Sequence, residues 1–153
     1  MTIETNKRLE ITNLISFRKQ SAPMELQGYM ERLLAYIAAQ GAEKIGGGMS
    51  ATYAMEADTI DMEVYIPINK EIPSTNEFTY KPRLYLENCI MAKHKGHPQF
   101  LEQTIQGLND YIVSNNLTPI SAGFNVTVNE VHDPKDADLF EVDVYISISP
   151  NVI

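Results

Sequence analysis

This sequence contains little cysteine and carries a deficit of positive charge. Its one cysteine, Cys89, has no partner for an internal disulfide and is predicted to be a small core residue. Lys and Arg number 12 against 20 Asp and Glu, which gives a formal net charge of −8. Nucleic-acid-binding proteins usually need a clustered basic face to displace counterions, and no basic run exists here. We therefore expect no nucleic-acid partner.

The chain also lacks long apolar runs and motifs for metals or phosphate. No run approaches the roughly 18 residues of a membrane span, and the start MTIETNKRLE has no apolar signal core. We therefore expect no membrane partner and a cytoplasmic location. His94 and His97 lack a convincing third ligand, and Gly46–Gly48 lacks the Lys-Ser/Thr of a phosphate loop. The sequence thus predicts neither a metal site nor a cofactor.

What the sequence does contain is an internal repeat. An offset of 75 aligns 11 identical residues between positions 9 and 52 and their counterparts. These pairs are Leu9/Leu84, Asn13/Asn88, Ile15/Ile90, Pro23/Pro98, Leu26/Leu101, Leu33/Leu108, Tyr36/Tyr111, Ile37/Ile112, Ile45/Ile120, Gly48/Gly123 and Thr52/Thr127. After an insertion near 132–136 the offset becomes 80, and Val64-Tyr65-Ile66 matches Val144-Tyr145-Ile146.

We infer a duplication with repeat 1 at 7–69, repeat 2 at 83–149 and a connector at 70–82, forming a single domain over 1–153. Two copies related by a pseudo-twofold axis create a groove at their junction, lined by equivalent residues from each copy. We expect the functional site in that groove.

Each copy reads as strand, helix, strand, strand. Alternating apolar residues predict strands near 9–18, 45–56, 59–68, 84–94, 120–131 and 138–148. Apolar residues at helical spacing follow Pro23 and Pro98, and the helices should end at Gly41 and at Asn115-Asn116. This order predicts the α+β class: two tandem pseudo-symmetric βαββ repeats forming an antiparallel sheet with two helices packed on it.

The last strand of each copy carries different chemistry on its two faces. Strand alternation places Met62, Val64, Ile66 and Ile68 on an apolar face, matched by Val142, Val144, Ile146 and Ile148. The opposite face carries Asp61, Glu63 and Tyr65 in one copy and Glu141, Asp143 and Tyr145 in the other. These carboxylates either lie on a solvent-exposed sheet face or line a pocket for a lipophilic cation.

Several segments of the second copy resemble a known family. They are Met91–Pro98, a helix ending Tyr111–Leu117, the turn His132-Asp133-Pro134 and the strand Glu141–Ile148. This pattern is similar to the GyrI-like small-molecule-binding fold, shared by the gyrase-inhibitory protein and by effector domains of multidrug-sensing transcription activators. The shared features are a duplicated strand–helix–strand–strand module, a Gly-x-Pro-like helix entry, an Asp-Pro turn and an acid opening the last strand.

The resemblance implies a role for two carboxylates. In that family an acidic residue of such a strand lies in a hydrophobic pocket and contacts cationic aromatic ligands, and this position falls on Asp143, with Glu63 as its first-copy equivalent. The chain departs from the pattern in having Asp rather than Glu at 143, Ser147 in place of a proline, and no tryptophan. Some relatives hydrolyse strained cyclopropane toxins with a pocket glutamate and aromatic help, and the missing tryptophan argues against that activity here.

We therefore predict a stand-alone protein that binds lipophilic, cationic small molecules between the repeats, as a monomer or weak homodimer. Glu63 and Asp143 would supply charge, Tyr65 and Tyr145 aromatic surface, and Asp61 and Glu141 an acidic rim. We predict no catalytic residues. Two alternatives stay open. The chain could be a protein-interaction module that inhibits a partner protein, or a hydrolase of electrophilic toxins with Glu63 or Asp143 activating water.

Overall fold

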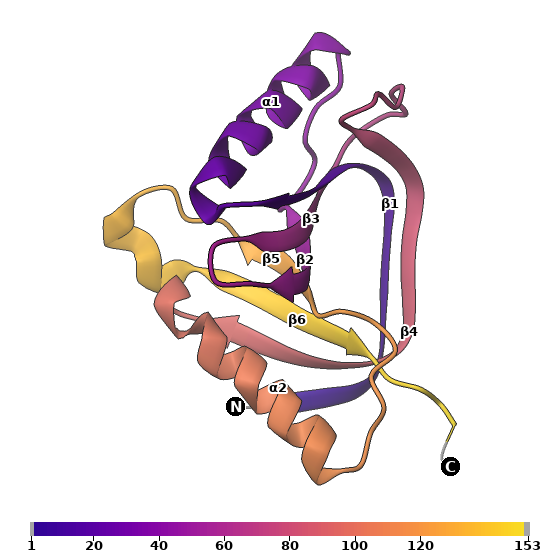
Figure 1. Cartoon of the computed structure of the whole chain (residues 1–153), viewed down its shortest axis with the longest axis vertical. Coiled ribbons are helices and arrows are strands. Elements are labelled where there is room, and N and C mark those ends of the chain that lie inside the picture. Colours follow the sequence, from indigo (N-terminus) through magenta and orange to yellow (C-terminus); the bar gives the residue numbers. More distant parts are fainter. Residues whose placement is uncertain (1, 152–153) are drawn as a thin grey trace. The chain divides into compact units, whose positions relative to one another are not determined.

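The computed structural model describes residues 2–151, and within them strands and helices follow the predicted order. The elements are β1 (Ile3–Ser21), a 3₁₀ turn (Pro23–Glu25), α1 (Leu26–Ala39), β2 (Met49–Met55), β3 (Ile60–Pro67), β4 (Thr79–Lys95), a 3₁₀ turn (Pro98–Phe100), α2 (Leu101–Ser114), β5 (Phe124–Asn129), a 3₁₀ segment (Pro134–Leu139) and β6 (Glu141–Ser147) (Figure 1). The predicted α+β class is confirmed.

Contacts along the chain divide it into two compact units. Unit 1 comprises Met1–Leu9 and Tyr85–Ile153, and unit 2 comprises Glu10–Leu84. The long strands β1 and β4 each continue from one unit into the other. The repeat bounds 7–69 and 83–149 and the single domain over 1–153 stay predictions.

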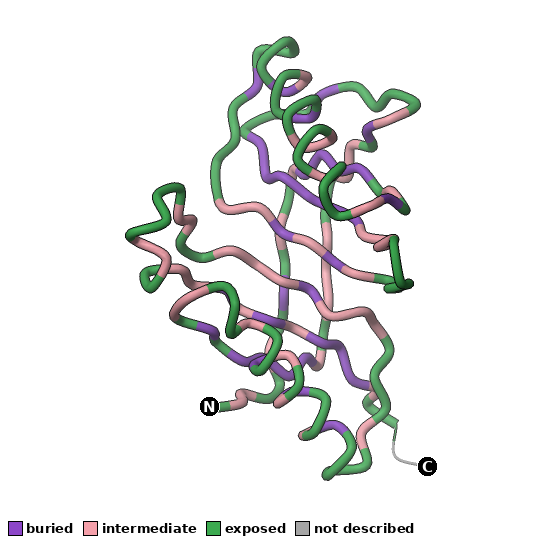
Figure 2. Tube along the Cα trace, turned by 60° about the vertical axis from the view of Figure 1, so that its left-hand side comes forward, coloured by how far each residue is buried: buried purple, intermediate pink, exposed green. Residues whose placement is uncertain are grey.

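Unit 2 is built around β3, which pairs antiparallel with β1 and β2. Its apolar face packs against α1, because the helix places Leu33 and Ile37 opposite Val64 and Ile66 in one buried cluster. Figure 2 shows this pattern as buried segments along the strands and exposed residues on the outer side of the helix. The predicted apolar face of this strand is therefore confirmed.

Unit 1 repeats the arrangement around β6, which pairs antiparallel with β4 and β5. Leu108 and Ile112 of α2 pack against Val142, Val144 and Ile146 of β6. A proline opens each helical segment at the first turn, where its missing N–H costs little. Helix ends match as well, because Gly41 and Asn116 both adopt positive φ, at 70° and 54°.

The strand registers of the two units follow the sequence offsets of 75 and 80. Arg18 lies opposite Glu63 in unit 2, and Lys93 lies opposite Asp143 in unit 1. A bulge interrupts β2 between Thr52 and Ala54 and β5 between Thr127 and Asn129. These matched registers place the two carboxylate–tyrosine faces at equivalent positions in their own units.

Each long strand contains an asparagine with left-handed backbone conformation. Asn13 and Asn88 adopt positive φ, at 56° and 53°, within β1 and β4. Their backbone carbonyls accept hydrogen bonds from Ile68 and Ile148. β1 is longer than predicted and begins at Ile3 rather than near Leu9. β4 likewise begins at Thr79, inside the predicted connector.

Within the described residues neither α-helix is long and apolar enough to cross a membrane.

Two adjacent leucines of α1 provide a test of this packing. Leu33 is fully buried, whereas Leu34 is 40% exposed. We expect Leu33→Ala to lower the free energy of unfolding by about 3 kcal/mol, since it removes buried methyl groups and leaves a cavity. Leu34→Ala should change it by less than about 1 kcal/mol. Urea denaturation of both variants measures the difference, and equal losses would contradict the assignment of the buried helix face.

Candidate functional site

The carboxylate of Glu63 is buried rather than displayed on an open sheet face. Glu63 is 7% exposed and its strand neighbour Tyr65 is 2% exposed, although both lie on the face of β3 opposite the helix-packing residues. A buried carboxylate is costly without partners, because it loses the hydration of its charge. The structure therefore has to supply donors at this position.

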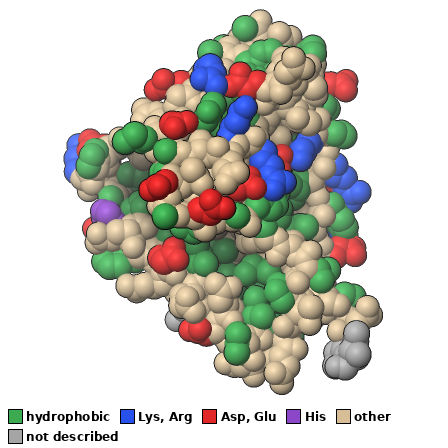
Figure 3. Space-filling model, in the orientation of Figure 1, with side chains coloured by type: hydrophobic (Ala, Val, Ile, Leu, Met, Phe, Trp, Pro, Cys, Tyr) green, Lys and Arg blue, Asp and Glu red, His purple; other side chains and the backbone are tan. Residues whose placement is uncertain are grey.

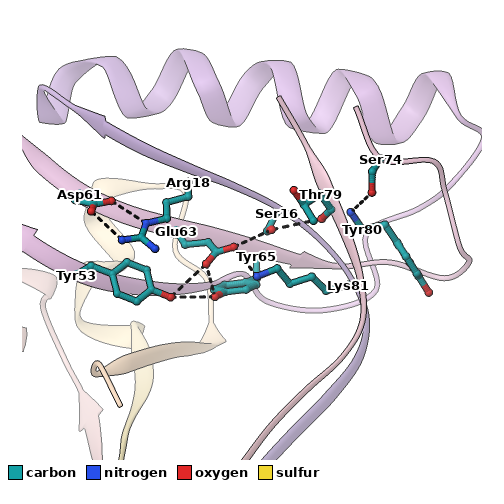
Figure 4. A network of polar contacts seen from close by, with 10 residues as sticks. All are labelled: Ser16, Arg18, Tyr53, Asp61, Glu63, Tyr65, Ser74, Thr79, Tyr80 and Lys81. Atoms are coloured by element: carbon teal, nitrogen blue, oxygen red, sulfur yellow. Dashed lines mark hydrogen bonds and ion pairs between the residues drawn. The ribbon is translucent and has the colours of Figure 1, made fainter. Parts of the chain in front are cut away.

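The Glu63 carboxylate is contacted by donors from three other strands and by Tyr65 of its own strand (Figure 4). Oε1 accepts from the hydroxyls of Tyr65 (2.7 Å) and Tyr53 (3.2 Å), and Oε2 accepts from Ser16 (3.1 Å) and forms an ion pair with Lys81 Nζ (2.9 Å). Ser16 comes from β1, Tyr53 from β2 and Lys81 from β4. All of them belong to unit 2.

These contacts decide the ionisation of both strand neighbours. Burial by itself would raise the pKa of Glu63, but the hydrogen bonds from Lys81, Tyr65 and Ser16 outweigh it and lower the pKa below the ordinary value. Burial and hydrogen bonds to Tyr53 and Glu63 raise the pKa of Tyr65 well above its usual range. At neutral pH the site therefore holds an ionised Glu63 carboxylate beside the neutral phenol of Tyr65.

The acid at the start of β3 has a different partner. Asp61 accepts two hydrogen bonds from Arg18, at 3.1 Å and 3.0 Å, and this pairing lowers the pKa of the Asp61 carboxyl. The Arg18 guanidinium also lies 3.9 Å from the ring centroid of Tyr53, a cation–π geometry. In unit 1 the corresponding acid, Glu141, is paired with Lys95 at 3.3 Å. The role of Asp61 and Glu141 as an acidic rim stays a prediction.

Asp143 in unit 1 has the same strand position as Glu63 but a different environment. It is only partly buried, and within the described residues no hydrogen bond or ion pair reaches it. Met91 of β4 and Phe124 of β5, both buried, lie opposite its neighbour Tyr145 in the strand register. The side chains that would correspond to Ser16 and Tyr53 are Met91 and Val128, which cannot donate.

Consequently the pKa values of the two equivalent acids are shifted in opposite directions: that of Glu63 is lowered and that of Asp143 is raised. Burial raises the pKa of Asp143; repulsion from Glu4 and Glu141 adds to this effect, and attraction to Lys93 and Lys7 opposes it. Burial likewise raises the pKa of Tyr145. The Lys81 ammonium thus balances the charge of Glu63, whereas Asp143 has no bonded cation within the described residues.

Lys81, Ser16 and Tyr53 were missed in the sequence analysis. Lys81 lies in the segment taken as a connector, and Ser16 lies on a strand known only from its apolar residues. Tyr53 reaches the site through the β2 bulge, which period-two alternation does not anticipate. The sequence did contain a signal for Arg18, because the 75-residue offset pairs it with another cation, Lys93. The structure places both cations opposite the acids.

His94 and Cys89 are both buried. The Nδ1 of His94 contacts Thr104 Oγ1 at 3.1 Å and its Nε2 contacts the carbonyls of Gly96 and His97. Burial raises the pKa of the Cys89 thiol. Among residues 2–151 no group of three His, Cys, Asp or Glu side chains is arranged to hold a metal ion.

Comparison with solved structures places this fold among known domains. The chain is similar to the EcmrR C-terminal domain, with a TM-score of 0.72 and 12% identity over 97% of this chain and 99% of that one. It matches the EcmrR chain of an EcmrR–DNA complex with a TM-score of 0.71 and 11% identity over 95% of its own length, and it spans only 57% of that chain. The predicted likeness to the GyrI-like fold is confirmed at the level of fold.

Two further proteins share this fold. SAV2435 bound to tetraphenylphosphonium has a TM-score of 0.58 and 8% identity over 97% of this chain and 93% of that one. A hydrolase from Listeria innocua has a TM-score of 0.57 and 9% identity over 94% and 92%. No protein-family model matches the sequence, and no curated protein matches it significantly.

The environment of Glu63 predicts a pH-dependent contribution to stability. Because folding lowers its pKa, the stabilisation is fully present above the unfolded-state value of about 4.3 and is lost as the pH falls through the folded-state pKa. We expect Glu63→Gln to lower the free energy of unfolding by about 2 kcal/mol at pH 7 and by much less near pH 3. Urea denaturation at both pH values measures this change. The exposed Glu71→Gln is the matched control, and a pH-independent loss in Glu63→Gln would refute the ionised network.

Proposed function

We propose that this chain binds lipophilic cations at the carboxylate–tyrosine faces of its central strands. The observation that carries the proposal is Asp143, a partly buried carboxylate without a bonded cation, two residues from Tyr145 on the same face of β6. A positive ligand charge beside it would replace a missing partner, and the phenol ring would offer a cation–π surface. The SAV2435 neighbour, bound to tetraphenylphosphonium, supports this choice of ligand class.

The surroundings of Asp143 favour a large organic cation over a small hydrated one. Met91 and Phe124 share the face of Tyr145, and both are buried. A compact ammonium ion would lose strong hydration at such a surface, whereas a bulky cation with dispersed charge loses less and buries apolar area. Methionine adds adaptability to ligand shape, which suits a site that accepts more than one such cation.

The negative net charge of the chain agrees with a cationic ligand. On the face drawn in Figure 3 acidic and basic side chains are interspersed. The net charge of −8 raises the local concentration of cations rather than of anions or nucleic acid. Glu63, with a lowered pKa and its own lysine partner, is the second acidic position of the proposed function.

Titration with tetraphenylphosphonium tests the assignment of Asp143. We expect Asp143→Asn to weaken binding on the order of tenfold, about 1.4 kcal/mol, because the substitution removes the charge and keeps the shape. Asp138→Asn, an exposed acid in the preceding segment, is the charge-matched control and should bind as the wild type does. Isothermal titration calorimetry measures both affinities. Equal affinity of Asp143→Asn and wild type would discard Asp143 as a ligand residue.

The raised pKa of Asp143 predicts that acid weakens binding. Only the ionised carboxylate attracts a cation, so affinity should fall as the pH drops through a value above the ordinary aspartate pKa of about 3.9. Tetraphenylphosphonium keeps its charge over this range, which assigns the change to the protein. Calorimetric titrations from pH 7 to pH 4 should show the decline in the wild type and a flatter profile in Asp143→Asn. A wild-type profile as flat as that of the variant would contradict the assignment.

A further inference from the structure

We propose that Lys81 is a resident cation of the Glu63 site, occupying the position of a ligand's positive charge and regulating access to that carboxylate. Its Nζ lies 2.9 Å from Glu63 Oε2 and 5.2 Å from the ring centroid of Tyr65 (Figure 4). A carboxylate and an aromatic face are the two contacts that a bound organic cation would use. The inference rests on the proposed function for the class of ligand.

The geometry allows Lys81 to leave without disturbing the fold. Its side chain is 35% exposed, and its flexible four-carbon stem can carry the ammonium into water while β4 stays in place. Glu63 would still accept hydrogen bonds from Ser16, Tyr53 and Tyr65. The carboxylate therefore remains held in position for an incoming cation.

Unit 1 shows the same strand position without a resident cation. The 75-residue offset places Asn6, an exposed neutral residue, at the position equivalent to Lys81. Its counterpart acid, Asp143, has no ion pair within the part of the chain that the structure describes. The acid of unit 2 is thus paired with a lysine, whereas the acid of unit 1 has no ion pair within the described residues.

A ligand must therefore compete with a tethered ammonium for Glu63. The ammonium contributes charge and hydrogen bonds but little apolar area, whereas an aromatic cation adds apolar burial against the tyrosine rings. Glu63 is expected to discriminate strongly in favour of lipophilic cations over simple amines. Removing the lysine should open the position to weaker cations as well.

The test measures tetraphenylphosphonium binding by calorimetry at pH 8, in a background of Asp143→Asn so that Glu63 is the remaining proposed acid. We expect adding Lys81→Met to tighten binding about tenfold, equivalent to ~1.4 kcal/mol. Adding Glu63→Gln as well should abolish that gain. Lys70→Met, which removes an exposed lysine, is the control and should give no gain.

The outcomes separate this inference from the proposed function. No gain with Lys81→Met, or a gain that survives Glu63→Gln, overturns the role of Lys81, whether or not Asp143→Asn weakened wild-type binding. The effect of Asp143→Asn alone decides the assignment of Asp143. Absence of binding to wild type and to every variant overturns both proposals.

A second measurement uses the wild-type protein and does not depend on the folding of a variant. Reductive methylation followed by mass spectrometry reports the reactivity of each lysine. Saturating tetraphenylphosphonium should raise the reactivity of Lys81 several-fold, because its ammonium loses the carboxylate, and leave Lys70 unchanged. Unchanged or reduced reactivity of Lys81 would show that the ligand does not displace it and would overturn the inference.

Discussion

In each unit the register of one strand is constrained by both of its faces. Side chains of β3 and β6 alternate between the face that packs on a helix and the face that carries an acid and a tyrosine. A slip of one residue in register would place Glu63 or Asp143 in the apolar cluster, at a cost of several kcal/mol for an uncompensated buried charge. The matched bulges and the pairing to β1 and β4 hold the register, and with it the position of both acids.

The two acids occupy matching strand positions in the two units but have different surroundings. Around Glu63 the neighbouring strands supply a serine, a second tyrosine and a lysine, and the lysine ammonium balances the charge of the carboxylate. Around Asp143 those positions hold a methionine, a valine and an asparagine. The strand registers match between the units while the electrostatics differ: Glu63 forms an ion pair with Lys81, and Asp143 has no ion pair within the described residues.

Helices, apolar strand faces and the positions of the acids could be predicted because they follow period 3.6, period 2 and an internal offset, all local signals. Lys81 could not, because its contact with Glu63 joins residues from strands far apart in the chain and its segment contains Pro73 and Pro82, which read as a linker. Likewise the beginnings of β1 and β4 could not be predicted, because residues 3–8 and 79–83 hold too few apolar residues to show a period-two alternation. Burial of Glu63 itself depends on these non-local partners.

The division of the chain has a consequence for its synthesis. Unit 2 is continuous from Glu10 to Leu84, so all of its contacts can form once that stretch has left the ribosome. Unit 1 combines Ile3–Leu9 with residues from Tyr85 onward, so Ile3–Leu9 can make no contacts within this unit before translation has passed Tyr85. Bringing these two segments together closes a long loop, and that closure costs conformational entropy that the continuous unit 2 does not have to meet.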